Sequence, residues 1–140
     1  MTALTAARTR ATTLTADASA APNARWFVRH QLADWGLTEP QLGADACAGV
    51  TELVVWALAN DAQRVLEVRV MWDGPLLFTE VCDRGEQLPH RPLWRQQDDG
   101  IAVAVLESAC LEWDAEPNWA GRCLWASYPT GRPEEAAVAA

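Results

Sequence analysis

Hydrophobic residues along the chain recur with two different spacings, which divide it into predicted helices and strands. From Gln41 to Ala59, the apolar positions return at the spacing of one helix face: Val50, Leu53, Val54, Ala57 and Leu58. Glu39-Pro40 marks the start of this helix and Asn60-Asp61 its end. From Arg64 to Trp72, apolar and polar residues alternate, which is typical of a strand with one buried face.

Turn and capping residues set the limits of the other predicted elements. Asn23 is expected to cap a helix that starts near Ala24 and ends at Gly36, after a short strand over Leu14–Ala18. Asp73-Gly74 predicts a hairpin turn. The remaining predicted elements are a return strand over Leu76–Cys82, a helix over Gly100–Leu111, and strands over Glu112–Glu116 and Arg122–Ser127.

The order of these elements indicates one α/β domain of the α+β kind. We expect a two-layer sandwich, in which a mixed, mostly antiparallel sheet carries the helices on one face. The domain is predicted to span residues 14–128, between a flexible lead (residues 1–13) and a disordered tail (residues 129–140). Residues 84–99 show no periodicity and are predicted to form a loop or lid. Trp94 in this segment either anchors a partner or packs onto the domain.

The charge of the chain restricts its partners. Among its 140 residues, 19 are acidic and 11 are basic, which gives a formal net charge of -8. Nucleic acids and anionic membranes bind clustered positive charge, so neither is an expected partner. The chain contains arginine but no lysine, which excludes the Gly-Lys-Ser/Thr phosphate-binding loop.

The four cysteines are predicted to be reduced and buried. Cys47, Cys82, Cys110 and Cys123 are widely spaced and form no Cys-x-x-Cys pair, so a zinc site is not expected. The first 21 residues lack the apolar core of a secretory signal, and no segment is expected to be long enough to cross a membrane. These features predict a cytoplasmic protein.

Several short segments together resemble a known family. They are the opening helix Ala24–Val28, the helix Thr51–Leu58, the element Val81–Gly85, the helix start Asp99–Val103 and the last strand Gly121–Ala126. In their order and spacing, the chain resembles the GHKL ATPases, which have the Bergerat-type ATP-binding fold. Within them it is most similar to the small bacterial anti-sigma-factor serine kinases and their histidine-kinase-like relatives. The resemblance covers residues 14–128.

The helix Thr51–Leu58 corresponds to the N-box of these kinases. Glu52 occupies the position of the general base, which the resemblance implies removes a proton from a substrate serine or from water. The alternative is a solvated helix glutamate. Trp56, one turn later, replaces an asparagine that holds magnesium in the family, and an indole offers no oxygen ligand. Its ring either fills the phosphate space or packs in the core. Asn60, a further turn along, is a weaker substitute ligand.

The adenine-binding element of the family corresponds to Val81–Gly85. The resemblance implies that Asp83 accepts a hydrogen bond from the adenine amine and that Gly85 lets the backbone approach the base. Gln87 replaces the second glycine of the family pattern. The alternative is an ordinary Asp-x-Gly turn at the end of a strand.

The phosphate-binding helix of the family corresponds to the helix that starts at Gly100. Amide groups at such a start favour bound phosphate. Asp98 stands where the family has a glycine, and Asp99 lies between the two positions. Two carboxylates repel phosphate, so helix capping by Asp98 or Asp99 is the favoured interpretation.

The resemblance leads to two main functional hypotheses. The first is a regulatory protein that binds a sigma factor or an anti-sigma antagonist, with binding of ATP and Mg²⁺ weakened or lost through the substitutions just described. The alternative is an active ATP-dependent serine protein kinase, supported by the retained family residues. A third hypothesis is a domain that binds a different small ligand in the altered pocket. The family also implies a homodimer.

Overall fold

The computed structural model describes residues 8–59, 64–83, 100–118 and 121–132. The elements follow in the predicted order of strands and helices. Their bounds are β1 (Arg8–Thr15), α1 (Ala20–Asp34), α2 (Pro40–Ala59), β2 (Val65–Trp72), β3 (Leu76–Asp83), α4 (Gly100–Ala109), β4 (Glu112–Asn118) and β5 (Gly121–Pro129).

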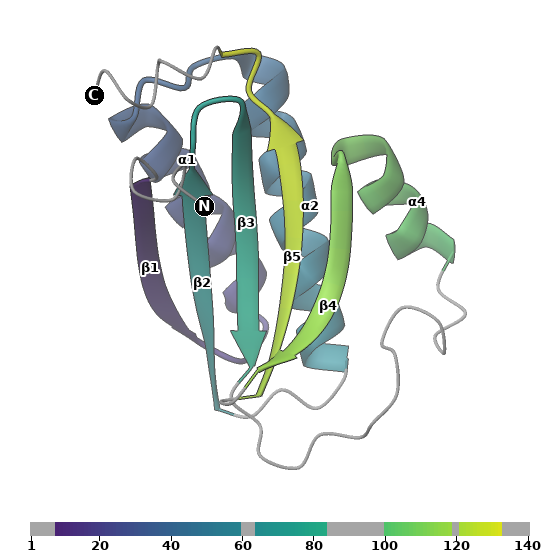
Figure 1. Cartoon of the computed structure of the whole chain (residues 1–140). Coiled ribbons are helices and arrows are strands. Elements are labelled where there is room, and N and C mark those ends of the chain that lie inside the picture. The colour runs from purple at the N-terminus through teal and green to yellow at the C-terminus, as the bar shows by residue number, and fades with distance from the viewer. Residues whose placement is uncertain (1–7, 60–63, 84–99, 119–120, 133–140) are drawn as a thin grey trace.

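The strands form one sheet with the order β1-β2-β3-β5-β4. Each pair of neighbouring strands among the described residues is antiparallel. Figure 1 shows the helices on one face of this sheet, while the face toward the viewer carries no helix. The predicted two-layer α+β fold is therefore confirmed, with antiparallel pairing throughout the described strands.

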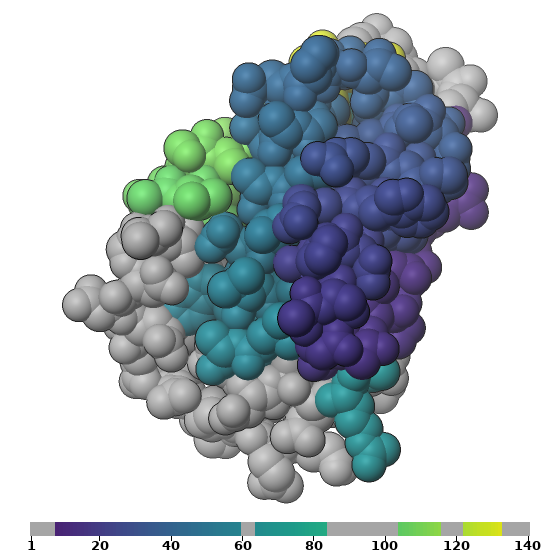
Figure 2. Space-filling model, turned by 180° about the vertical axis from the view of Figure 1, so that it is seen from behind, coloured from purple at the N-terminus to yellow at the C-terminus, as the bar shows by residue number. Residues whose placement is uncertain are grey.

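Helix α2 is the centre of the helical layer. It packs against α1, α4, β3 and β5, and Figure 2 shows α1 and α2 side by side over this face of the molecule. Because neighbours surround it, the helix is apolar on most sides. By length and composition it is apolar enough to cross a membrane, although half of the tested window is buried inside the fold. The prediction that no segment reaches this length was wrong.

Strand β1 starts earlier than predicted. It runs from Arg8 to Thr15 and pairs with β2 along its whole length, so residues 8–13 belong to the sheet and not to a flexible lead. As an edge strand it leaves most of its side chains exposed. Exposed positions need no apolar side chains, so threonine and arginine can occupy them. The strand therefore shows no alternating apolar pattern in the sequence.

Helix α1 also starts earlier than predicted. Ser19 is its N-cap, so Asn23 lies inside the helix. Pro22 is accommodated because its missing amide hydrogen costs no hydrogen bond in the first turn. At the other end, Gly36 has φ of 73°, which confirms the predicted glycine after the helix.

The start of the predicted tail is held against the domain. Strand β5 continues to Pro129, and the buried hydroxyl of Thr130 donates a hydrogen bond to the carbonyl of Gly74. The guanidinium of Arg132 donates to the carbonyl of Gly36 at 2.9 Å and pairs with the carboxylate of Glu39 at 3.2 Å. Residues 129–132 are thus ordered, contrary to the prediction, while residues 133–140 lie outside the described residues.

Tyr128 fixes the distance between the sheet and helix α2. Its hydroxyl shares a 2.7 Å hydrogen bond with Thr79 on the neighbouring strand, and burial raises the pKa of this phenol well above its usual range. A Cβ atom at Gly49 would lie 2.0 Å from the Tyr128 oxygen. Glycine at position 49 therefore allows the close approach of β5 and α2.

We predict opposite effects for two glycine-to-alanine changes in helix α2. Gly49→Ala should lower the free energy of unfolding by about 1–3 kcal/mol, because the new methyl group overlaps Tyr128. Gly43→Ala is the matched control, since its Cβ meets nothing within 4 Å. It should raise the free energy of unfolding by about 0.5–1 kcal/mol through helix propensity. Urea denaturation measures both; equal effects would contradict the packing account.

Candidate functional site

The structure brings the predicted motif helices together. The guanidinium of Arg25, in the opening helix, donates a hydrogen bond to the hydroxyl of Thr51 at 3.2 Å. That hydroxyl in turn donates to the carbonyl of Cys47 at 2.7 Å. Glu52 follows Thr51 on α2 and is partly exposed. These contacts hold α2 against α1 at Thr51, the residue before the predicted base.

Trp56 is part of the hydrophobic core. Its side chain is only 2% exposed, and it belongs to the buried cluster that also contains Leu53 and Ala57. This location agrees with core packing, one of the two interpretations of Trp56. An indole at this position supplies no oxygen to a metal, so the described residues do not fit a magnesium site of the family type.

Of the other predicted site residues, Asp83 and Gly100 are among the described residues. In Figure 1, β3 and α2 both end at the lower edge, where Asp83 is the last residue of β3. Gly100 begins helix α4, which packs against α2. Asn60 and Gly85 lie outside the described residues, as do Gln87, Trp94, Asp98 and Asp99. Their predicted roles stay predictions.

Asp83 forms a buried ion pair that the sequence analysis did not anticipate. An oxygen of its carboxylate lies 2.9 Å from a guanidinium nitrogen of Arg122, and the side chains are 3% and 9% exposed. The two residues are direct neighbours in the register of β3 and β5. The carboxylate predicted to accept the adenine amine therefore already has a cationic partner of the same chain.

A disulfide lies one residue away from this ion pair. Cys82 and Cys123 are directly opposite each other on β3 and β5 and are joined by a disulfide bond. Their neighbours Val81 and Leu124 face the buried core, so the disulfide lies on the face without helices. The prediction of four reduced cysteines was wrong for this pair. Its sulfur atoms lie close to Glu80, but a disulfide supplies no thiolate to a metal.

The two remaining cysteines are free thiols in the structure. Cys47 is buried, and desolvation raises the pKa of its thiol. Burial, followed by the negative charge of Asp45, raises the pKa of Cys110 to about 11. Both thiols are therefore protonated at neutral pH and are poor nucleophiles.

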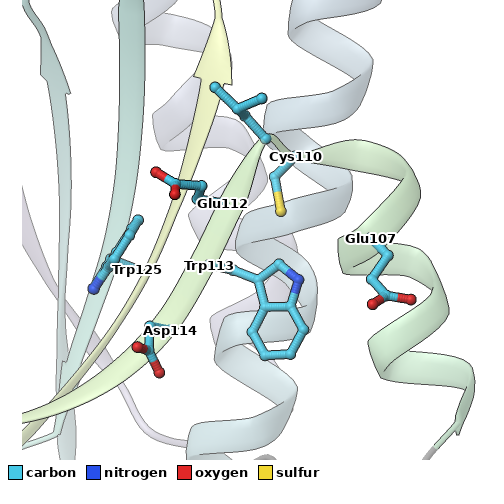
Figure 3. A pocket seen from close by; sticks show the side chains of 7 residues that line it. Glu107, Cys110, Glu112, Trp113, Asp114 and Trp125 are labelled. Carbon is cyan, nitrogen blue, oxygen red and sulfur yellow. The ribbon is translucent and has the colours of Figure 1, made fainter.

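An open hollow of about 510 Å³ lies along β4 beside the end of α4. Its lining residues are Glu107, Cys110, Leu111, Glu112, Trp113, Asp114 and Trp125. In Figure 3, Glu107, Cys110 and Trp113 lie on one side of β4, whereas Glu112, Asp114 and Trp125 lie on the other. We call this hollow the α4–β4 groove. In the sequence, the alternation in Glu112-Trp113-Asp114 predicts a strand but does not by itself indicate a groove.

We predict that breaking the Asp83–Arg122 pair from one side destabilises the fold strongly. Arg122→Met leaves a buried carboxylate without its cation and should lower the free energy of unfolding by about 3–5 kcal/mol. The double variant Asp83→Leu/Arg122→Met removes both charges and should recover most of this loss. Urea denaturation of the three proteins provides the comparison. A loss below about 1 kcal/mol in the single variant would show that the pair is solvated.

We predict two reactive thiols in the unfolded, unreduced chain. The Cys82–Cys123 bond leaves only Cys47 and Cys110 to react with Ellman's reagent in guanidinium. Prior reduction should raise the count to four and lower the stability of the refolded chain by about 2–4 kcal/mol. Cys82→Ala/Cys123→Ala, the control, should give two thiols with or without reduction. Four thiols in the unreduced wild type would contradict the disulfide.

Comparison with solved structures shows that this fold occurs in a known protein. The chain matches the crystal structure of the RsbU and RsbW domains of Rv1364c from Mycobacterium tuberculosis, with a TM-score of 0.64 and 23% sequence identity. The match covers 87% of this chain and 32% of that chain, so this chain spans about a third of its length. No family model and no curated protein sequence matches. At this identity, the comparison establishes the shared α+β fold alone.

Proposed function

We propose that this chain is a regulatory protein that acts by binding a protein partner, with binding of ATP and Mg²⁺ weakened or lost. The partner class is a sigma factor or an anti-sigma antagonist, and the chain acts as a homodimer. The fold shared with the RsbU and RsbW domain structure supports the comparison with anti-sigma-factor kinases. The departures of the sequence from the kinase pattern support the loss of nucleotide binding.

One observation carries this proposal: Arg122 holds the carboxylate of Asp83. Adenine recognition of the family type needs this carboxylate as an acceptor, and a ligand amine would have to compete with the guanidinium for it. Leaving one member of a buried ion pair without its partner costs about 3–5 kcal/mol. A cost of that size corresponds to roughly a hundred- to several-thousand-fold loss of affinity.

The burial of Trp56 supports the same conclusion independently. Because the residue is a tryptophan, there is no oxygen ligand at the position where the family holds magnesium. Restoring that ligand would require the substitution Trp56→Asn. Because Trp56 is buried, this substitution would leave a cavity in the core. The metal-dependent part of the family chemistry is thus weakened at a second position.

An active serine protein kinase is the second candidate function. Glu52 remains partly exposed on α2, where a general base must be reachable, and Gly100 begins helix α4. This candidate requires Arg122 to share or release the carboxylate of Asp83 when the nucleotide binds.

We predict no saturable binding of ATP with magnesium up to about 1 mM, measured by titration calorimetry on the native chain. Micromolar binding that is lost in Asp83→Asn would contradict the proposal. Glu80→Gln is the matched control for that variant, because it makes the same acid-to-amide change on the other face of β3. Transfer of labelled phosphate to a protein substrate, lost in Glu52→Gln, would establish the kinase instead.

A further inference from the structure

The α4–β4 groove combines negative charge with aromatic surface. Glu112 and Asp114 bring two carboxylates to the side of β4 that carries Trp125, while Glu107 lies on the other side with Trp113. No arginine or histidine is among the lining residues. Trp113 and Trp125 supply indole rings on the two sides of β4 (Figure 3). Carboxylates and indole faces are the two kinds of group that bind organic cations in proteins.

The carboxylates of the groove lie at the surface. Glu107, Glu112 and Asp114 are all exposed. Within the described part of the chain, none of them forms an ion pair with an arginine or histidine of the same protein. They are thus accessible to a cation that approaches from outside.

We infer that the α4–β4 groove binds an arginine side chain presented by a basic segment of the protein partner. The inference rests on the proposed function, because it takes the chain to act through such a partner. A guanidinium is planar, stacks on an indole and donates two parallel hydrogen bonds to one carboxylate, so it uses both components of this groove. Its contacts would come from Glu112 and Asp114 together with the ring of Trp125.

The backbone of β4 is unsuited to strand addition, which favours binding through side chains. The amide of Ala115 donates a 2.8 Å hydrogen bond to the carboxylate of Asp114, and Pro117 has no amide hydrogen. Both features limit the donors that an added strand needs at a sheet edge. The partner therefore need not be extended along β4.

Charge also argues against a second copy of this chain in the groove. Two copies would bring their acidic grooves together, and each chain has a net charge of -8. Like charges at an interface oppose association, whereas a basic segment is complementary to the groove. The occupant is therefore a basic partner, and a homodimer would form through another surface.

The test uses an acetylated and amidated pentapeptide with arginine at two alternate positions, titrated into the native chain at low salt. Tryptophan fluorescence and calorimetry should both show saturable binding. A peptide with citrulline in place of arginine keeps the shape but loses the charge, and it should bind about tenfold more weakly. Equal affinity for the two peptides would overturn the inference.

Two double variants locate the site. Glu112→Gln/Asp114→Asn should weaken binding of the arginine peptide about tenfold. The control Asp34→Asn/Glu39→Gln removes the same charge from exposed residues elsewhere and should change the affinity less than about twofold. Equal losses in both variants would show non-specific attraction and overturn the inference.

Trp125→Leu tests which ring stacks on the arginine. This variant should abolish the fluorescence response to the peptide; an unchanged response would overturn the assignment of Trp125 as the stacked ring.

The outcomes separate this inference from the proposed function. Micromolar ATP binding would contradict the proposed function without affecting the peptide result. Equal binding of the arginine and citrulline peptides, with ATP binding absent, would remove the groove as the arginine site and leave the regulatory function in place.

Discussion

The ion pair between Asp83 and Arg122 is the constraint on which the account of this protein depends. It joins the last residue of β3 to β5, and both side chains are buried. On the adjacent pair of residues, the Cys82–Cys123 disulfide joins the same two strands on the opposite face. Two different bonds thus fix the end of β3, where the carboxylate of Asp83 lies. Both bonds stabilise the pairing of β3 with β5 at this end of the sheet.

Helix α2 is the second element whose packing shapes the described part of the fold. It carries Glu52 and Trp56, for which the sequence resemblance predicts a general base and a lost metal ligand. Trp56 is buried in the core, and the same helix contacts the sheet so closely that Gly49 meets Tyr128. The large side chains of this region fill space between layers. Trp56 therefore contributes to the core of the domain, while Glu52 on the same helix stays partly exposed.

The sequence was sufficient to predict the order of the elements and the layer architecture, because α2 and β2 have clear periods and Gly36 and Gly74 mark their turns. It missed most of β1, since an edge strand such as Arg8–Thr15 needs no buried alternation. It also missed both bonds between β3 and β5. Their register depends on packing across a separation of 41 residues between Cys82 and Cys123, which no local pattern records. For the same reason, the partner of Asp83 could not be read from its motif, although the motif located Asp83 correctly at the end of a strand.

The most direct test of the central claim observes the guanidinium of Arg122 by ¹⁵N nuclear magnetic resonance while ATP and magnesium are added. The signal of Arg122 is assigned as the one that disappears from the spectrum of the Arg122→Lys variant. The account predicts guanidinium hydrogens protected from solvent exchange, as in a buried ion pair, with a signal that does not move at millimolar nucleotide. A signal that shifts saturably and loses its protection as nucleotide binds would contradict the account, because it would show that Arg122 releases Asp83 to the ligand.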